Sequence, residues 1–125
     1  LAPKEKLTKI RLLYVDCPEK KQPYGEAARE YTSWYLRMGE RLQINSTKID
    51  LYGRTLATVC PIVPHEGVCL SVNEALLESG FAWLYYSKSK DLQSLESLAR
   101  QEKVGLWNDS HPVPPWEFRK SKKSK

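Results

Sequence analysis

The sequence predicts a small mixed α+β domain in which strands form a barrel and helices cover its outside. Strands and helices alternate along the chain, two or three strands follow one another directly, and the repeated βαβ units of a doubly wound parallel sheet are missing. The chain has 125 residues, 41% hydrophobic and 28% charged. This is enough to bury a core without disulfides or metal ions. No apolar run is long enough to span a bilayer, so we expect no membrane association through a spanning segment.

The first half of the chain carries patterns for a strand, a helix and two further strands. Residues 7–15 form an apolar run that predicts a buried strand, and a proline-rich loop follows. From Tyr24 onward, apolar residues recur at three- and four-residue steps, which predicts a helix that stops at Gly39. Residues 41–50 and 54–63 alternate like strands around a turn.

The second half continues with short elements that have clear end signals. Residues 68–70 are predicted to pair back across a hairpin turn, and residues 71–80 to form a helix capped by Ser71. Residues 81–86 read as a buried strand or extended segment. Residues 89–107 contain the last helix, with leucines on one stripe.

Charge is concentrated at the C-terminal end. The formal net charge is +5 and the pI about 9.1, which favours polyanionic partners such as nucleic acid or an anionic membrane surface. The tail "FRKSKKSK" contributes five positive charges, so the rest of the chain is close to neutral. We expect residues 110–125 to form an extended, polyproline-like strap and a disordered basic tail. A specific binding arm is the alternative.

The three cysteines do not have the spacing of a zinc site. Cys60 and Cys69 flank a predicted hairpin connection, so they could face each other and form a disulfide. Two free, packed thiols are an equally acceptable interpretation. A bridge would indicate an oxidising compartment.

Candidate chemistry lies at the end of the first strand and at the turn near residue 54. Arg11 interrupts the apolar run, either as a structural arginine paired with a carboxylate or as a phosphate-binding group. Asp16 and Glu19 follow at the strand end, where carboxylates could hold a divalent cation; a turn residue and a solvated residue are the plain alternatives. Arg54 follows a tight turn. Two arginines with two carboxylates supply what phosphodiester hydrolysis requires.

Five ordered motifs resemble the staphylococcal nuclease (thermonuclease-like) family. They are "IRLLYVDCPE", "YGEAAR", "YGRTLA", "VNEALLESGFAW" and "KVGLW", and they extend from Ile10 to Trp107. The resemblance implies an OB-type five-stranded barrel with three helices over residues 1–109. It also implies calcium-dependent hydrolysis of DNA and RNA, with a preference for single strands, that leaves 3′-phosphate ends.

The resemblance assigns roles to individual residues. Arg11 corresponds to the first phosphate-binding arginine and Arg54 to the second, which stabilises the transition state. Asp16 corresponds to a calcium ligand and Glu19 to the general base that activates water. Cys17 replaces a threonine whose backbone carbonyl binds calcium.

Two further features follow from the same resemblance. Tyr86 falls near a tyrosine that the family uses at the nucleotide site. The family's first strand carries an Asp-Gly-Asp segment with another calcium ligand, whereas residues 1–10 contain no aspartate. We therefore expect the first strand to be truncated or absent in this chain, through a fragment boundary or a lost ligand. The open sheet edge that results would favour a domain-swapped oligomer.

The leading hypothesis is thus a calcium-dependent nuclease acting on DNA and RNA, without an obligate protein partner. Because an unselective nuclease endangers its own cell, we expect export to the periplasm or the medium. A non-catalytic OB-type module that binds single-stranded nucleic acid, or serves as a scaffold, is the alternative.

Overall fold

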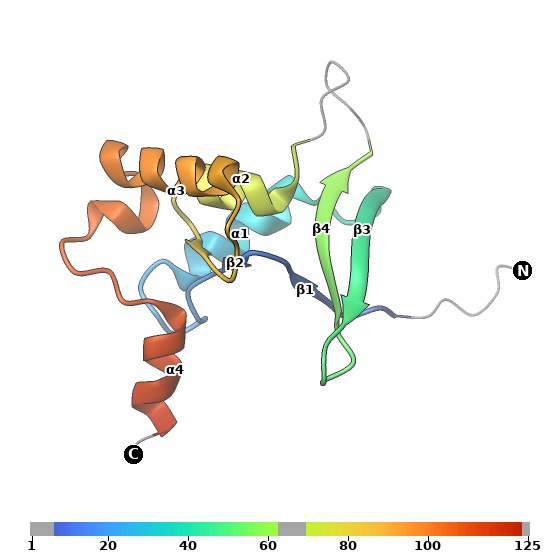
Figure 1. The fold of residues 1–125 in the computed structure, drawn as a ribbon, viewed down its shortest axis with the longest axis horizontal. Coiled ribbons are helices and arrows are strands. Elements are labelled where there is room, and N and C mark those ends of the chain that lie inside the picture. The colour runs from blue at the N-terminus through green and yellow to red at the C-terminus, as the bar shows by residue number, and fades with distance from the viewer. Residues whose placement is uncertain (1–6, 63–69, 124–125) are drawn as a thin grey trace, which may run out of the picture.

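The computed structural model describes residues 7–62 and 70–123 (Figure 1). The elements, in chain order, are β1 (Ile10–Leu12), β2 (Val15–Asp16), α1 (Gly25–Tyr35), β3 (Leu42–Ile49), β4 (Thr55–Pro61), α2 (Val72–Glu78), β5 (Trp83–Leu84), α3 (Lys90–Glu102), the 3-10 helix η1 (Gly105–Asn108) and α4 (Pro115–Lys123). The prediction of a mixed α+β domain is therefore confirmed. Among the described residues, no helix is both long and apolar enough to cross a membrane.

The strands form two small open sheets. In the first sheet β4 is central, with β1 parallel on one side and β3 antiparallel on the other. In the second sheet β2 pairs with β5 in antiparallel orientation. The described strands therefore do not close into the expected five-stranded barrel. Domain swapping through an open edge stays a prediction.

The single strand expected at residues 7–15 is interrupted. Tyr14 has a φ of 68°, a left-handed backbone conformation that extended chain cannot accommodate, and it separates β1 from β2. The backbone N–H of Leu13 still donates to the carbonyl of Ala57 at 2.9 Å, so the chain leaves the first sheet only at this point. The return strand predicted at residues 68–70 falls largely outside the described residues.

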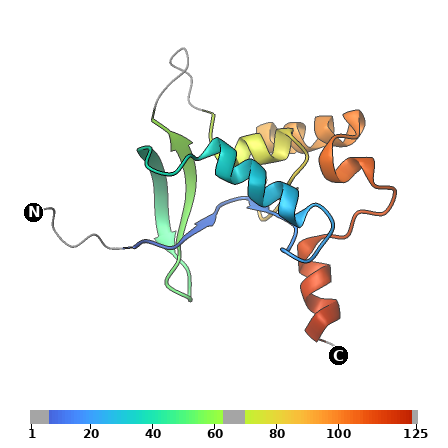
Figure 2. The same cartoon turned by 180° about the vertical axis from the view of Figure 1, so that it is seen from behind.

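The core lies between the β4 strand and the helical layer. Helices α1, α2 and α3 gather on one side of the β3–β4 hairpin in both views (Figures 1 and 2). Apolar side chains from β2, β4, α2 and the segment before β5 fill the space between them: Val15, Ala57, Val59, Val72, Leu76, Leu77 and Ala82. This core holds the carboxyl end of β2 in place, and that end carries the candidate site.

Helix boundaries were predicted well where a capping side chain is present. The Ser71 hydroxyl accepts a hydrogen bond from the backbone N–H of Glu74 at 3.1 Å and donates to its carboxylate at 2.9 Å, as predicted for the start of α2. The expected stop of the first helix at Gly39 is wrong, because α1 ends at Tyr35. Met38 is fully exposed, so its apolar spacing did not reflect burial.

The prediction of an extended strap and disordered tail is wrong for residues 115–123, which form α4. Pro115 occupies the first helical position, where the missing N–H costs nothing and the fixed φ suits a helix. The negative charge of Glu117 in the first turn interacts favourably with the helix dipole. The described part of the chain consequently has a fourth α-helix where three were expected. In both views α4 projects away from the other helices and starts beside the loop after β2 (Figures 1 and 2).

Candidate active site

A cleft of about 840 Å³ lies where β1 and β2 meet the β3–β4 turn and α4. Its lining includes every predicted arginine and carboxylate of the site, together with one arginine that was not predicted. The polar and aromatic lining residues are Arg11, Asp16, Cys17, Glu19, Asp50, Tyr52, Arg54, Tyr85 and Arg119. The structure therefore brings the sequence-predicted residues from separate segments into one place.

Asp16 ends β2 and is almost completely buried, with 4% of its surface exposed. Its carboxylate lies between two guanidinium groups. Arg11 Nη2 is 3.4 Å from Oδ1, and Arg119 Nη2 donates to Oδ2 at 2.8 Å. A buried carboxylate is costly unless it is paired, and these two arginines meet that requirement.

Arg11 is accommodated within an apolar strand because its head group turns back to the strand end. Its Nη1 donates to the carbonyl oxygens of Val15 at 3.1 Å and Leu12 at 3.3 Å. The guanidinium also lies 5.8 Å from the ring centre of Tyr85. Arg11 is thus both the structural partner of Asp16 and a cation facing the cleft.

Glu19 is held by a tight turn rather than by a mobile loop. Its backbone N–H donates to Gln22 Oε1 at 2.7 Å, and its carbonyl accepts from the backbone N–H of Gln22 at 2.9 Å. Gln22 is itself buried and donates through Nε2 to the carbonyl of Val113 at 2.9 Å. The buried amide therefore ties the Glu19 turn to the segment that leads into α4.

Arg54 is oriented by Asp50 across the β3–β4 turn. Its Nε donates to Asp50 Oδ2 at 2.7 Å, while Asp50 Oδ1 accepts from the backbone N–H groups of Tyr52 and Arg54 at 2.8 and 2.9 Å. Burial by itself would raise the pKa of Asp50, but the hydrogen bonds from Arg54 and Tyr52 outweigh it and lower that pKa. Asp50 was not predicted as a site residue; its place at the start of the "DLYGR" turn was the available signal.

Arg119 is the other residue that the sequence did not reveal. From α4, its Nη1 donates to Glu19 Oε1 and its Nη2 to Asp16 Oδ2, both at 2.8 Å. The bond to Asp16 is the main cause that raises the pKa of Arg119. In the sequence this arginine looks like one more charge in a basic tail, and about one hundred residues separate it from its partners.

The remaining predicted residues have different positions. Tyr86 is 86% exposed and is not one of the residues that line the cleft; its neighbour Tyr85 is. The rings of Tyr85 and Tyr86 contact each other, with 4.3 Å between their centres. The nucleotide-binding role of Tyr86 stays a prediction. Cys69 lies outside the described residues, and the Cys60–Cys69 disulfide likewise stays a prediction.

Cys17 is a free cysteine at the cleft. Burial and the neighbouring Asp16 carboxylate raise the pKa of its thiol to about 12, against the opposing effect of Arg11. The thiol is therefore protonated at neutral pH and is not a metal ligand in that state. The proposed contribution of Cys17 is through its backbone carbonyl, which does not depend on the thiol.

The donor set can be compared with what a calcium ion requires. Asp16 and Glu19 converge on a single cation, which here is the guanidinium of Arg119. Carboxylate oxygens are the donors that Ca²⁺ prefers, so the residues present fit it in kind. Within residues 7–62 and 70–123, no group of three or more His, Cys, Asp or Glu side chains is placed to hold a metal. Backbone carbonyls and water would have to complete the coordination.

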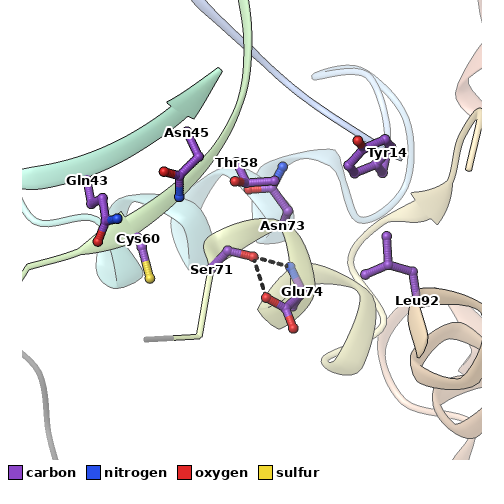
Figure 3. Close-up of a pocket in the computed structure, with 9 residues that line it drawn as sticks. All are labelled: Tyr14, Gln43, Asn45, Thr58, Cys60, Ser71, Asn73, Glu74 and Leu92. Carbon is purple, nitrogen blue, oxygen red and sulfur yellow. Dashed lines mark hydrogen bonds between the residues drawn. The ribbon is translucent and has the colours of Figure 1, made fainter. Parts of the chain in front are cut away.

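A second, smaller hollow of about 260 Å³ lies on another part of the sheet (Figure 3). Asn73 lines it and is buried, with its amide fully used: Oδ1 accepts from the N–H of Val59, and Nδ2 donates to the carbonyls of Leu13 and Ala57. Glu74 is engaged by Ser71 at the start of α2. This hollow is thus part of the framework that holds β4 against the β1–β2 turn.

Fold and cleft together define a small α+β domain with an arginine- and carboxylate-lined cleft at a sheet end. The model of the family described as "Staphylococcal nuclease homologue" matches residues 9–109. An "Uncharacterized endonuclease" from Escherichia coli O157:H7 is 38% identical over 119 residues, covering 94% of this chain and 74% of that protein. The "Micrococcal nuclease" of Shigella flexneri is 32% identical over 123 residues, covering 93% and 70%. The chain belongs to the staphylococcal nuclease homologue family, which confirms the resemblance found in its motifs.

A plant relative places the same segment in a longer protein. "Staphylococcal-like nuclease CAN1" from Arabidopsis thaliana is 38% identical over 121 residues, covering 92% of this chain but 34% of that protein. The family segment is therefore found both in relatives of similar length and in one about three times as long.

Proposed function

We propose that this chain is a calcium-dependent nuclease that hydrolyses phosphodiester bonds of DNA and RNA, prefers single strands and leaves 3′-phosphate ends. The main support is one observation: Arg11, Asp16 and Glu19 from one motif line a single cleft together with Arg54, which comes from a separate segment. Family membership and the names of the relatives support the same reaction class.

Each side chain has a defined part in the proposed reaction. Glu19 accepts a proton from the water that attacks phosphorus, and the bond to the 5′ oxygen breaks as that oxygen takes up a proton from solvent water. Glu19 then returns its proton to solvent. Arg11 and Arg54 donate hydrogen bonds to phosphate oxygens, on which negative charge develops in the transition state. Asp50 fixes Arg54 through Nε and leaves its two terminal nitrogens to face the substrate.

Asp16 and Glu19, with the backbone carbonyl of Cys17, are the groups that would hold calcium. The ion would supply charge neutralisation at the phosphate when bound. The contact with Arg11 fixes the orientation of the buried Asp16 carboxylate, which lines the cleft.

The test is digestion of single-stranded DNA and RNA by the full chain with added Ca²⁺ and with EDTA. We expect cleavage with Ca²⁺, none with EDTA, and products with 3′-phosphate ends. Equal digestion in EDTA would eliminate the metal-dependent mechanism. No digestion by the full chain at any Ca²⁺ concentration, including with Arg119 replaced by alanine, would eliminate the nuclease assignment.

Site variants with matched controls test the residue roles. Glu19→Gln should reduce the rate far more than substrate binding, and Arg54→Ala should reduce it at least about a hundredfold, as when a transition-state hydrogen-bond donor is removed. Glu26→Gln and Arg37→Ala change the same residue types at exposed positions outside the cleft and should retain the rate. Full activity in both site variants would show that these roles are wrong.

A non-catalytic nucleic-acid-binding module is the second candidate. One observation favours it: both candidate metal-binding carboxylates are already paired with Arg119. In this case the chain would bind single-stranded oligonucleotides with strong salt dependence, but would not cleave them under any cation condition. Fluorescence anisotropy at two salt concentrations, together with the digestion assay, separates the two functions.

A further inference from the structure

Arg119 occupies the position where the two candidate metal-binding carboxylates converge. One guanidinium contacts Asp16 through Nη2 and Glu19 through Nη1, each at 2.8 Å. The second oxygen of the Asp16 carboxylate faces Arg11 at 3.4 Å. A divalent cation and this guanidinium cannot occupy the same carboxylate oxygens together.

The placement of Arg119 is determined by several packed contacts at the start of α4. Pro115 is fully buried, and the Trp116 ring stacks on Tyr85 at 5.5 Å with an interplanar angle of 27°. Trp116 also meets Trp83 edge-on at 5.7 Å. Since Arg119 follows Pro115 by four residues and Trp116 by three, it lies beside each of them on the helix surface.

The rest of α4 is held less firmly. Glu117, Lys120 and Lys122 are exposed, and a hollow of about 350 Å³ separates α4 from the Lys20–Lys21 segment. Arg119 itself is partly exposed, with 41% of its side-chain surface accessible. The contact of Arg119 with Asp16 and Glu19 is therefore formed but partly exposed to solvent, and it is not enclosed in a packed core. It can open without unfolding the domain.

We propose that α4 is an autoinhibitory segment and that Arg119 competes with a divalent cation for Asp16 and Glu19. This inference depends on the proposed function for its biological meaning. While Arg119 is in place, its guanidinium occupies Glu19 Oε1 and Asp16 Oδ2, so neither oxygen is open to a cation or to water. Release of Arg119 frees both carboxylates.

The competition has a measurable consequence. When a binding-competent state is only fractionally populated, the apparent dissociation constant is the intrinsic one divided by that fraction. If Arg119 is in place nine-tenths of the time, removal of its side chain should tighten cation binding about tenfold. A nearby charge that does not contact the carboxylates should have little effect.

The experiment is a titration of the full chain with Tb³⁺, a calcium substitute whose luminescence is sensitised by nearby tyrosine and tryptophan. Arg119→Ala should bind Tb³⁺ about tenfold more tightly than the wild type. Lys122→Ala is the matched control, because it removes one positive charge from the same helix without touching Asp16 or Glu19. Arg119→Gln, together with thermal melting of each variant, guards against a loss of folding in the alanine variant.

The outcomes are distinct. Equal Tb³⁺ affinity in the wild type and both folded Arg119 variants, or no saturable binding in any of them, would overturn the inference. An equal gain in Lys122→Ala would also overturn it, because general charge would then explain the effect. Tighter Tb³⁺ binding in Arg119→Ala without cleavage of nucleic acid would support the competition and remove the nuclease assignment.

Nuclease activity provides the second readout. Under the proposal, Arg119→Ala should reach half-maximal cleavage at about a tenfold lower Ca²⁺ concentration, again relative to Lys122→Ala. If Arg119 were a third phosphate-binding arginine, the same variant would lose activity at saturating Ca²⁺. That result, with unchanged Tb³⁺ affinity, would replace the autoinhibitory role with a substrate-binding one.

Discussion

The backbone carbonyl oxygen of Glu19 lies only 2.0 Å from the point where a Cβ atom on Gly25 would be. The first turn of α1 thus packs directly against the turn that presents the candidate general base. The carbonyl of Lys20 lies 3.0 Å from the same point. Only glycine permits this approach, so the "YG" at the start of α1 determines the position of Glu19.

Gly25→Ala should therefore move Glu19 without altering its side chain. We expect a loss of stability of about 1–3 kcal/mol, as for overpacking at a tight contact, and a rate reduction of up to about a hundredfold from misplacement of the carboxylate. Chemical denaturation and the digestion assay measure the two effects. Glu26→Ala, an exposed change in the same turn, is the control. An active, fully stable Gly25→Ala variant would show that the Glu19 turn is not held by this contact.

Replacing Asn73, which is buried and does not line the cleft, should strongly reduce the stability of the fold. The Asn73 amide accepts from the N–H of Val59 at 3.1 Å and donates to the carbonyls of Leu13 and Ala57 at 2.9 and 3.1 Å. Asn73→Ala would remove this partner from the N–H of Val59 and the carbonyl of Leu13, whereas the carbonyl of Ala57 keeps its bond from the N–H of Leu13. The cost is about 1–3 kcal/mol for each buried group that stays unsatisfied. Asn45→Ala, an exposed change in the same hollow, should have little effect (Figure 3). Similar denaturation midpoints for the two variants would contradict the framework role.

Local patterns predicted much of this fold because their causes are local. The capping pair Ser71 and Glu74 determines where α2 begins, and alternation along β3 and β4 determines that hairpin. The apolar run at residues 7–15 was harder to interpret, since a single positive φ at Tyr14 divides it. A tyrosine in the sequence does not indicate a left-handed backbone conformation.

The site was predictable only as far as its motifs reach. Asp16 and Glu19 lie within one motif, and Arg54 lies in another, so their order along the chain was informative. The contact of Arg119 with the two carboxylates depends on how α4 folds back, and no periodicity near residue 119 specifies that. In the sequence, Arg119 is one of several charges in a basic tail. Its partners could not be predicted, because long-range ion pairs leave no pattern in a single sequence.

Cys17 should react slowly with thiol reagents. Burial first, and the Asp16 carboxylate second, raise the pKa of the Cys17 thiol from the usual 9.0 to about 12. Since only the thiolate is nucleophilic, alkylation in the folded chain at pH 8 should be about a thousandfold slower than in the unfolded chain. Iodoacetamide labelling followed by mass spectrometry of the Cys17 peptide measures this rate. Labelling as fast as in the denatured protein would contradict the buried, protonated thiol.

The same shift predicts a decrease in stability at high pH. The unfolded thiol ionises near pH 9, whereas the folded one keeps its proton until about pH 12. The stabilisation that the protonated thiol gives is complete below about pH 9 and is lost as the pH rises toward about 12. Because other groups titrate in this range, the measurement is the difference in melting temperature between the wild type and Cys17→Ala across it. A pH-independent difference would contradict the shift.

The Asp50–Arg54 pair predicts the opposite pH dependence. Burial tends to raise the pKa of Asp50, but the hydrogen bonds from Arg54 and Tyr52 prevail, so the folded pKa lies below the usual 3.8. A carboxyl with a lowered folded pKa stabilises the fold above its unfolded pKa, and this contribution disappears as the pH falls through the folded pKa. Asp50→Asn should therefore melt at a lower temperature than the wild type at pH 7, and the difference should shrink below about pH 4.

The same substitution should also reduce the activity proposed for this cleft. Without the carboxylate, the Nε of Arg54 loses its charged partner at 2.7 Å, and the guanidinium is free to rotate away from the substrate. We expect a tenfold or greater reduction in kcat, on the order of the cost of misplacing a catalytic group. Glu26→Gln removes a carboxylate at an exposed position and serves as the control. If Asp50→Asn cleaves nucleic acid at the wild-type rate, Arg54 does not depend on Asp50 for its orientation in the transition state.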